Sequence, residues 1–182
     1  NMILVINNSN KNKEIFNKQK IKEKNYQLQE LVTDNCTLSY GIVQPGDEIE
    51  NGTLIVRPVD MHKKDIVIDK LKKIKPSIAN KSKKTELNGD EILLTVRGST
   101  GDISFSNPNL KGANVSRGVI PIRLNTKIIL KDFAYYQMMD NKLQKQIFEK
   151  TYGTALQQIN VRDVKKLILK VVPLSNQRNI CE

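Results

Sequence analysis

Two arginine-bearing segments hold the side chains best suited to recognising another molecule. The first is RGSTG at residues 97–101, where Arg97 stands beside the hydroxyls of Ser99 and Thr100. An arginine fork binds guanine or phosphate oxygens, and flanking glycines let backbone amides approach a ligand closely. The alternative is a tight hairpin in which Arg97 pairs with an acid such as Asp102, and the pentapeptide by itself favours this alternative.

The second segment is GANVSRG at residues 112–118. Its Asn114 carries an amide that can bind adenine bidentately, while Ser116 and Arg117 supply a hydroxyl and a positive charge. The alternative is a turn that Asn114 caps, with Arg117 in solvent. Both arginine segments adjoin the same predicted sheet, which strengthens the hypothesis that they bind one partner.

Two uncharged segments could extend this polar surface. YGTALQQIN at residues 152–160 contributes Gln157 and Gln158, whose amides suit hydrogen bonds to bases or to a backbone. The alternative for this segment is a turn that caps the following helix. Tyr40 and Gln44 could form a further rim, unless Tyr40 is a core residue of an edge strand.

The sequence lacks the residue patterns of the common catalytic and metal centres. It has no G-x-G turn for a nucleoside cofactor, no Glu with Lys two positions later for a magnesium nuclease, and no G-x-S-x-G. The single histidine, His62, has no Cys or His at ligand spacing, and Cys36 and Cys181 lie far apart. We therefore expect no catalytic residue, metal or cofactor in this chain, and a reducing, cytoplasmic compartment.

Size and charge describe a basic globular protein. The 182 residues carry 30 Lys and Arg against 19 Asp and Glu, a formal net charge of +11. This excess favours a polyanionic partner, because neutralising phosphates releases condensed counterions. No apolar run approaches the roughly 20 residues of a membrane span, so we expect no membrane partner.

Apolar periodicity predicts a sheet flanked by helices, an α/β (α+β) fold. We expect strands at residues 53–59, 66–68, 92–96, 119–124 and 167–172, and a strand edge that ends in a turn at 40–47. We expect helices at residues 26–32, 131–140, 143–149 and 161–166, with helix starts at 76–77 and from residue 173.

Taken in order along the chain, these motifs resemble the DNA-specificity subunits of Type I restriction-modification systems. The matching segments are YGIVQPG at residues 40–46, GD at 89–90, LLT at 93–95, RGSTG at 97–101, the stretch 112–123, GTALQQI at 153–159 and PLSNQRNI at 173–180. The resemblance runs from about residue 26 to the C-terminus, and the ordered series is far more specific than any single motif.

The resemblance implies one target recognition domain at residues 26–172, an α/β unit with an irregular, barrel-like mixed sheet that reads half of a bipartite site in double-stranded DNA. Residues 1–25 are then a polar leader, and residues 173–182 are the start of a truncated spacer helix. One recognition domain and a short helix also depart from the full family pattern, which predicts a fragment or a half-subunit.

The spacer helix of the family implies contacts to a partner or to a second such helix, in a homodimer or with a second recognition domain. The residues expected to make them are Leu174, Gln177, Arg178 and Ile180. The resemblance further implies methyltransferase subunits and a motor-nuclease subunit as partners. S-adenosylmethionine, ATP and magnesium are then expected only in those partner subunits.

Sequence-specific duplex DNA binding without a catalytic step is therefore the leading functional hypothesis. Its expected contact residues are Tyr40, Gln44, Arg97, Ser99, Thr100, Asn114, Ser116, Arg117, Gln157 and Gln158. One alternative is the recognition domain of a fused, Type IIG-like methyltransferase-nuclease, which uses a similar domain. Another is a basic RNA-binding module, although 5% aromatic residues offer few stacking platforms.

Overall fold

The computed structural model describes residues 22–181 as a mixture of short strands and helices. Its strands are β1 (Lys24–Gln27), β2 (Thr53–Val56), β3 (Lys72–Ile74), β4 (Ile92–Phe105), β5 (Asn114–Val115), β6 (Val119–Ile122), β7 (Gln157–Gln158) and β8 (Ile168–Val171). Its α-helices are α1 (Pro76–Ala79), α2 (Lys131–Met139), α3 (Asn141–Lys150), α4 (Val161–Lys165) and α5 (Leu174–Cys181). Its 3-10 helices are η1 (Leu28–Glu30), η2 (Pro58–Asp60), η3 (Ile68–Lys70), η4 (Lys83–Thr85) and η5 (Pro108–Leu110).

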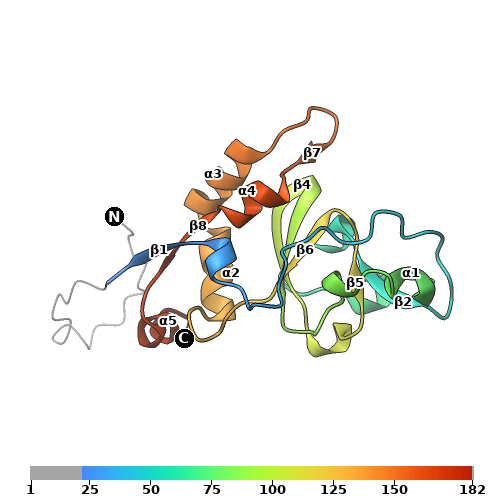
Figure 1. Ribbon diagram of the computed structural model, residues 1–182, viewed down its shortest axis with the longest axis horizontal. Helices are drawn as coiled ribbons and strands as arrows, with labels where there is room; N and C mark the ends of the chain where they lie inside the picture. The colour runs from blue at the N-terminus through green and yellow to red at the C-terminus, as the bar shows by residue number, and fades with distance from the viewer. Residues whose placement is uncertain (1–21, 182) are drawn as a thin grey trace, which may run out of the picture.

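The strands form three small sheets, ordered β6-β4-β7, β3-β2-β5 and β1-β8. Helices α2 and α3 lie on one side of the β6-β4-β7 sheet, while β2, β5 and α1 lie on the other (Figure 1). β2 pairs antiparallel with β3 and parallel with β5, so the middle sheet is mixed. The α/β class expected from the sequence is confirmed, with the irregular sheet divided into three parts.

Strand β4 is buried on both faces at its start, which explains its continuous apolar run. Side chains alternate across a strand, so Ile92, Leu94 and Val96 share one face and join the larger core. Leu93 points to the other face and joins a second core with Val115 of β5. The β6-β4-β7 sheet is therefore held between two apolar layers.

The helical layer packs its apolar stripe against this sheet. Phe133 and Met138 of α2 and Leu143 and Ile147 of α3 are buried in the larger core. Helix α3 begins where the Asp140 side chain accepts a hydrogen bond from the backbone N–H of Lys142 at 2.8 Å. The expected helices at residues 131–140, 143–149 and 161–166 are confirmed as α2, α3 and α4, with small shifts at their ends.

Four sequence-based expectations differ from the structure. Residues 26–32 hold the end of β1 and the 3-10 helix η1 rather than a helix, because β1 pairs with β8. Residues 66–68 lead into η3 instead of forming a strand. The strand edge expected at 40–47 is reduced to one bridge from Ile42 to Ser116. β1 also begins at Lys24, inside the expected leader, of which residues 1–21 lie outside the described part.

Candidate nucleic-acid interface

Strand β4 doubles back on itself and carries Arg97 to the tip of the hairpin. Ser106 donates its backbone N–H to the carbonyl of Glu91 at 2.9 Å, although 15 residues of straight strand would span about 50 Å. Asp102 likewise donates its N–H to the Thr95 hydroxyl at 2.9 Å. Both contacts are symmetric about Gly98 and Ser99, and Gly98 has the positive φ of 92° typical of a turn glycine. RGSTG is thus a hairpin tip continuous with β4, not a separate loop.

Strand β7 brings the two glutamines alongside this tip. Arg97 pairs with Gln158, and Gly98 pairs with Gln157, in an antiparallel ladder. The segment that carries β7 is itself closed by reciprocal backbone hydrogen bonds of 2.9 Å between Tyr152 and Gln158. Segments about 60 residues apart in sequence therefore present their polar side chains together.

The turn that carries Arg117 abuts the same strand. Val96 donates its N–H to the carbonyl of Gly118 at 2.8 Å, so each arginine lies one residue from this contact. A Cβ at Gly118 would lie 2.5 Å from Cγ of Pro58 and 3.1 Å from the carbonyl oxygen of Arg97. Only glycine permits this approach, which places the two arginine segments against each other.

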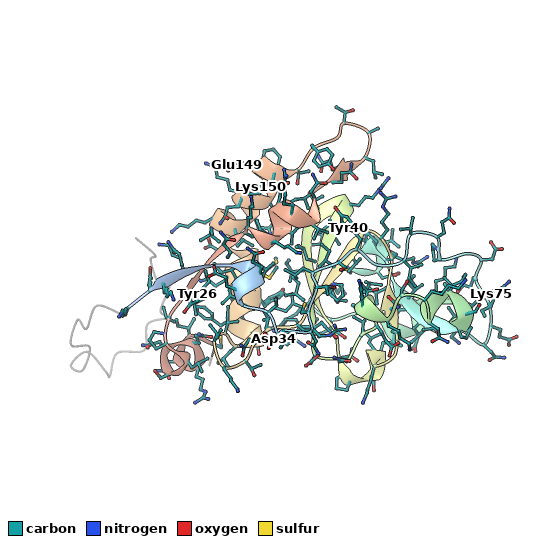
Figure 2. The ribbon with its side chains drawn as sticks, viewed as in Figure 1. Tyr26, Asp34, Tyr40, Lys75, Glu149 and Lys150 are labelled. Atoms are coloured by element: carbon teal, nitrogen blue, oxygen red, sulfur yellow. The ribbon has the colours of Figure 1, made fainter. Side chains whose placement is uncertain are left out.

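Segment 40–44 completes the arrangement through backbone contacts. Arg117 donates its N–H to the Ile42 carbonyl at 2.8 Å. The Tyr40 hydroxyl donates to the Ile159 carbonyl and accepts from the Val161 N–H, each at 3.1 Å, so Tyr40 ties this segment to the start of α4 (Figure 2). The Tyr40 hydroxyl already makes two hydrogen bonds within the chain. Tyr40 therefore stabilises this surface and is less suited to contact a base. Gln44, two residues beyond Ile42, is exposed.

The polar side chains at the tip are accessible. Arg117, Ser99 and Gln157 are exposed, and Arg97 and Gln158 are half-buried. Among residues 22–181, no acid pairs with either Arg97 or Arg117, so the ion pair to Asp102 weighed above is absent from this part of the chain. Both guanidinium groups can accept an external partner.

Two other cations, Arg57 and Lys64, are already paired within the chain. Arg57 forms a bidentate bond to Asp60, with Nε–Oδ2 and Nη2–Oδ1 both 3.0 Å. This pairing, led by the side-chain hydrogen bond, raises the pKa of Arg57 above its usual value. Lys64 pairs with Asp132 at 3.1 Å. These cations stabilise the fold, which distinguishes them from Arg97 and Arg117.

Asn114 is a correction to the predicted contact set. Its side chain is 1% exposed. Its Oδ1 accepts from the Thr85 hydroxyl at 2.7 Å and from the Val115 N–H at 2.9 Å, and its Nδ2 donates to the Ser82 carbonyl at 3.0 Å. The amide holds η4 against β5 and cannot reach a base, so the predicted adenine contact is wrong.

Two hydroxyls of the predicted set have restricted roles. The Thr100 hydroxyl lies 3.1 Å from that of Thr151, which donates its only proton to the Ile147 carbonyl at 2.8 Å. Thr100 must therefore donate to Thr151, and its hydroxyl faces α3. Ser116 is half-buried in its bridge to Ile42, which leaves it at the rim of the surface.

Helix α5 confirms the helix expected from residue 173, but one of its predicted contacts is wrong. Gln177 is 0% exposed. Its Oε1 accepts from the Leu130 N–H at 2.8 Å, and its Nε2 donates to the Ile128 and Val172 carbonyls at 2.9 and 2.8 Å. Gln177 therefore anchors α5 to its own domain and does not face a partner. The remaining three predicted contacts are accessible in different degrees: Leu174 is half-buried, and Arg178 and Ile180 are exposed.

Sequence reasoning missed Arg162 and Gln144. Arg162 is exposed on α4, directly after Val161, whose N–H donates a hydrogen bond to the Tyr40 hydroxyl. The sequence signal for Arg162 was a basic residue in the first turn of the helix that follows Gln157 and Gln158. Gln144 contacts the hairpin from α3, and nothing in its spacing indicated this.

A buried ion pair fixes the base of β4. Glu91 is 0% exposed, and its carboxylate accepts from the N–H groups of Asn88, Gly89 and Asp90 and from Arg123 Nε at 3.0 Å. Burial alone would raise the pKa of Glu91, but the backbone donors and Arg123 outweigh it and lower the pKa below its usual value. The carboxylate is therefore charged at neutral pH and locks the strand that carries Arg97.

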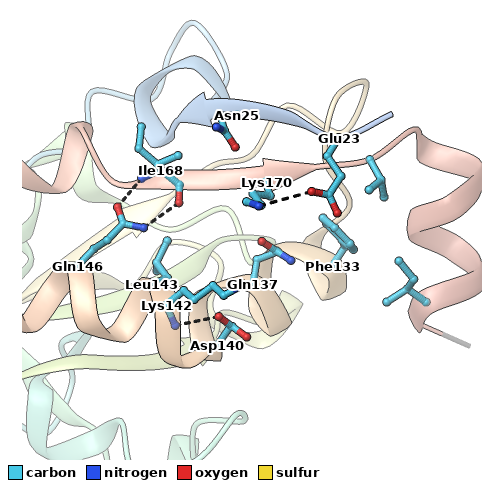
Figure 3. A pocket seen from close by; sticks show the side chains of 12 residues that line it. Glu23, Asn25, Phe133, Gln137, Asp140, Lys142, Leu143, Gln146, Ile168 and Lys170 are labelled. Carbon is cyan, nitrogen blue, oxygen red and sulfur yellow. Dashed lines mark hydrogen bonds and ion pairs between the residues drawn. The ribbon is translucent and has the colours of Figure 1, made fainter. Parts of the chain in front are cut away.

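A groove of about 210 Å³ lies elsewhere, between α2, α3, β8 and the end of α5 (Figure 3). Its lining includes Phe133, Leu143, Ile168 and Ile180 and none of the predicted DNA contacts. Within residues 22–181, no cluster of His, Cys, Asp and Glu could hold a metal ion. No helix in the same range is long and apolar enough to cross a bilayer.

A family model for the Type I restriction modification DNA specificity domain matches residues 7–182. A curated relative, the Type I restriction enzyme EcoBI specificity subunit of Escherichia coli, is 26% identical over 153 residues. That match covers 84% of this chain and 32% of the relative, so the chain spans about a third of the relative's length.

Solved structures share the fold. A Type I restriction-modification S subunit from M. genitalium superposes with a TM-score of 0.58 at 18% identity, over 90% of this chain and 38% of that one. The HsdS subunit from Thermoanaerobacter tengcongensis gives a TM-score of 0.62 at 17% identity, over 86% and 40% of the two chains. At these identities the likeness shows the fold alone.

Proposed function

The chain belongs to the Type I restriction modification DNA specificity domain family, and from this premise we propose that it binds duplex DNA at a specific sequence. Residues 26–172, with β1 extending the unit to Lys24, are the proposed target recognition domain. Residues 173–182 are the proposed start of a spacer helix, and residues 1–25 are the proposed leader.

The observation that carries this proposal is the meeting of three polar segments at one end of the β6-β4-β7 sheet. Arg97, Arg117 and Gln157 come from different parts of the chain and are held there by backbone hydrogen bonds. Two arginine forks that form no ion pair with any described residue lie beside amide groups, and these donors match those that read guanine and adenine edges in the major groove. The formal net charge of +11 adds attraction to the phosphates.

Specificity subunits of this family are non-catalytic, in agreement with the expectation that this chain performs no chemical step. We propose that it selects the site at which partner subunits act. Those partners are methyltransferase subunits and a motor-nuclease subunit, with S-adenosylmethionine, ATP and magnesium bound there, in the cytoplasm. The exposed Arg178 and Ile180 on α5 are available for contact with a second spacer helix or a second copy of this chain.

Competition binding tests the class of partner. The full chain is bound to a labelled duplex pool near physiological salt, and unlabelled duplex DNA, single-stranded RNA or heparin is added. We expect duplex DNA to compete best. The arginine forks match base edges that the major groove of duplex DNA displays side by side, and single-stranded RNA and heparin have no such groove. Preferential displacement by single-stranded RNA would instead favour the RNA-binding module.

A further inference from the structure

Helix α3 and the residue that follows it form hydrogen bonds to Thr100 and Gly101, which follow the tip of the Arg97 hairpin. Gln144 Nε2 donates to the Gly101 carbonyl at 3.0 Å and to the Met138 carbonyl at 2.8 Å. Near the end of the helix, the Ile147 carbonyl accepts a hydrogen bond from the Thr151 hydroxyl. The Thr151 hydroxyl accepts in turn from the Thr100 hydroxyl. The two residues that follow the tip are therefore both bonded to α3 or to the residue that ends it.

The tip itself has few other supports. Gly98 and Ser99 are exposed, and a Cβ at Gly98 would have no heavy atom within 4 Å. The ladder to β7 contains only the pairs of Arg97 and Gly98. An arginine fork must be held within about 0.5 Å of its productive position to discriminate bases. Contacts on the far side of the hairpin are therefore needed to fix the direction of Arg97.

We propose, on the basis of the proposed function, that Gln144 is a positioning residue for base recognition by Arg97. Its side-chain amide ties the hairpin to α3, so that the fork meets one base edge in one orientation. Without this tie the tip keeps its charge and its attraction to phosphates but reads the base less strictly.

The same helix supplies a matched control. Gln146 also bridges backbone groups, accepting from the Ile168 N–H at 2.9 Å and donating to the Ile168 carbonyl at 3.0 Å (Figure 3). Ile168 belongs to β8, away from the hairpin. Gln144→Leu and Gln146→Leu each remove two hydrogen bonds to backbone from one glutamine of α3, but only the first loosens the Arg97 tip.

The test is a double-mutant cycle on base discrimination in the full chain. A duplex is selected with the wild-type chain from a randomised pool, and every base pair is then exchanged in turn. The position at which Arg97→Ala loses most discrimination is the base pair assigned to Arg97. The competition ratio for that exchange is measured for wild type, Gln144→Leu, Gln146→Leu, Arg97→Ala and the two double variants.

We expect Gln144→Leu to lower this ratio about threefold to tenfold, and to have no further effect once Arg97 is alanine. Gln146→Leu should leave the ratio unchanged in both backgrounds, although both variants lower the midpoint of urea unfolding. An unchanged ratio in Gln144→Leu, or equal effects of the two glutamine variants, would overturn the positioning role alone. If the wild-type chain selects no sequence, the proposed function itself fails.

Discussion

Arg97 reaches the surface at the β4 hairpin tip and Arg117 in the adjoining turn between β5 and β6, but their surroundings differ. Arg97 is half-buried beside Gln158, whereas Arg117 is exposed in a turn. Partial desolvation strengthens a hydrogen bond to a base, so we expect Arg97 to read and Arg117 mainly to clamp. Arg97→Ala should cost about 1 to 3 kcal/mol of binding on the preferred sequence and less on others. Arg117→Ala should weaken all sequences more evenly, as measured by competition with varied half-sites.

Arg178→Ala is the matched control for these variants, because it removes an exposed arginine from α5, away from the tip. We expect it to leave the ranking of sequences unchanged. Equal loss on every sequence for Arg97→Ala would contradict its base-reading role.

Residue type and spacing pointed to Arg97, Arg117 and the glutamine pair, which the structure brings to one surface, while their role in binding stays a prediction. They could not reveal that Asn114 is buried. Its partners Thr85 and Ser82 are 29 and 32 residues away and reach it only after η4 folds onto β5. Gln177 was misjudged for the same reason, since the Leu130 N–H and the Ile128 carbonyl that bind its amide lie in the segment before α2.

Among the elements, those with strong apolar periodicity were predictable. The start of β4, β6 and the helices α2 to α4 were expected from local apolar spacing, whereas α5 was expected from the motif that opens at Pro173. β1 was not predictable, since Tyr26 becomes a strand residue through pairing with Leu169 at the other end of the chain. The fold-back within β4 was foreseen only as the alternative hairpin, and its ion pair is absent from the described residues.

The Tyr40 hydroxyl links segment 40–44 to the start of α4, so removing this hydroxyl breaks the link. Tyr40→Phe removes the bonds to Ile159 and Val161 while keeping the ring. We expect a loss of about 1 to 2 kcal/mol of unfolding free energy, because each hydrogen bond contributes about 1 kcal/mol. Amide exchange at Val161 should accelerate more than exchange in α2. Uniform acceleration across the chain would show that Tyr40 does not brace this surface locally.

At the scale of the whole molecule, the Glu91–Arg123 pair makes stability depend on pH. The pKa of Glu91 is lower in the folded chain than in the unfolded chain. The ionised carboxylate therefore stabilises the fold above the ordinary glutamate pKa of about 4.3, and this contribution is lost as pH falls through the lower folded value. Glu91→Gln should cost about 3 kcal/mol at pH 7, and the difference from wild type should narrow in acid.

Urea unfolding between neutral and acidic pH measures this effect. Glu86→Gln is the control, because Glu86 pairs with Lys83 in a more exposed ion pair that contributes little. A difference between wild type and Glu91→Gln that does not change from pH 7 to pH 3 would contradict the assignment.

The positive charge of the molecule predicts binding that weakens with salt. The logarithm of the binding constant should fall linearly with the logarithm of salt concentration, by about 0.9 per phosphate neutralised. Arg162, exposed in α4, is the expected phosphate contact. Arg162→Ala should lower the salt slope by about one and weaken all sequences alike. A change in sequence ranking without a change in slope would assign Arg162 to base reading instead.

Selection from a randomised duplex pool tests most directly whether this molecule reads DNA sequence. The full chain is bound near physiological salt, and the retained duplexes are sequenced over several rounds. We predict enrichment of one short motif by the wild-type chain and its loss in the Arg97→Ala, Arg117→Ala double variant, which should still bind DNA weakly. Retention of duplexes without any enriched motif would contradict the account.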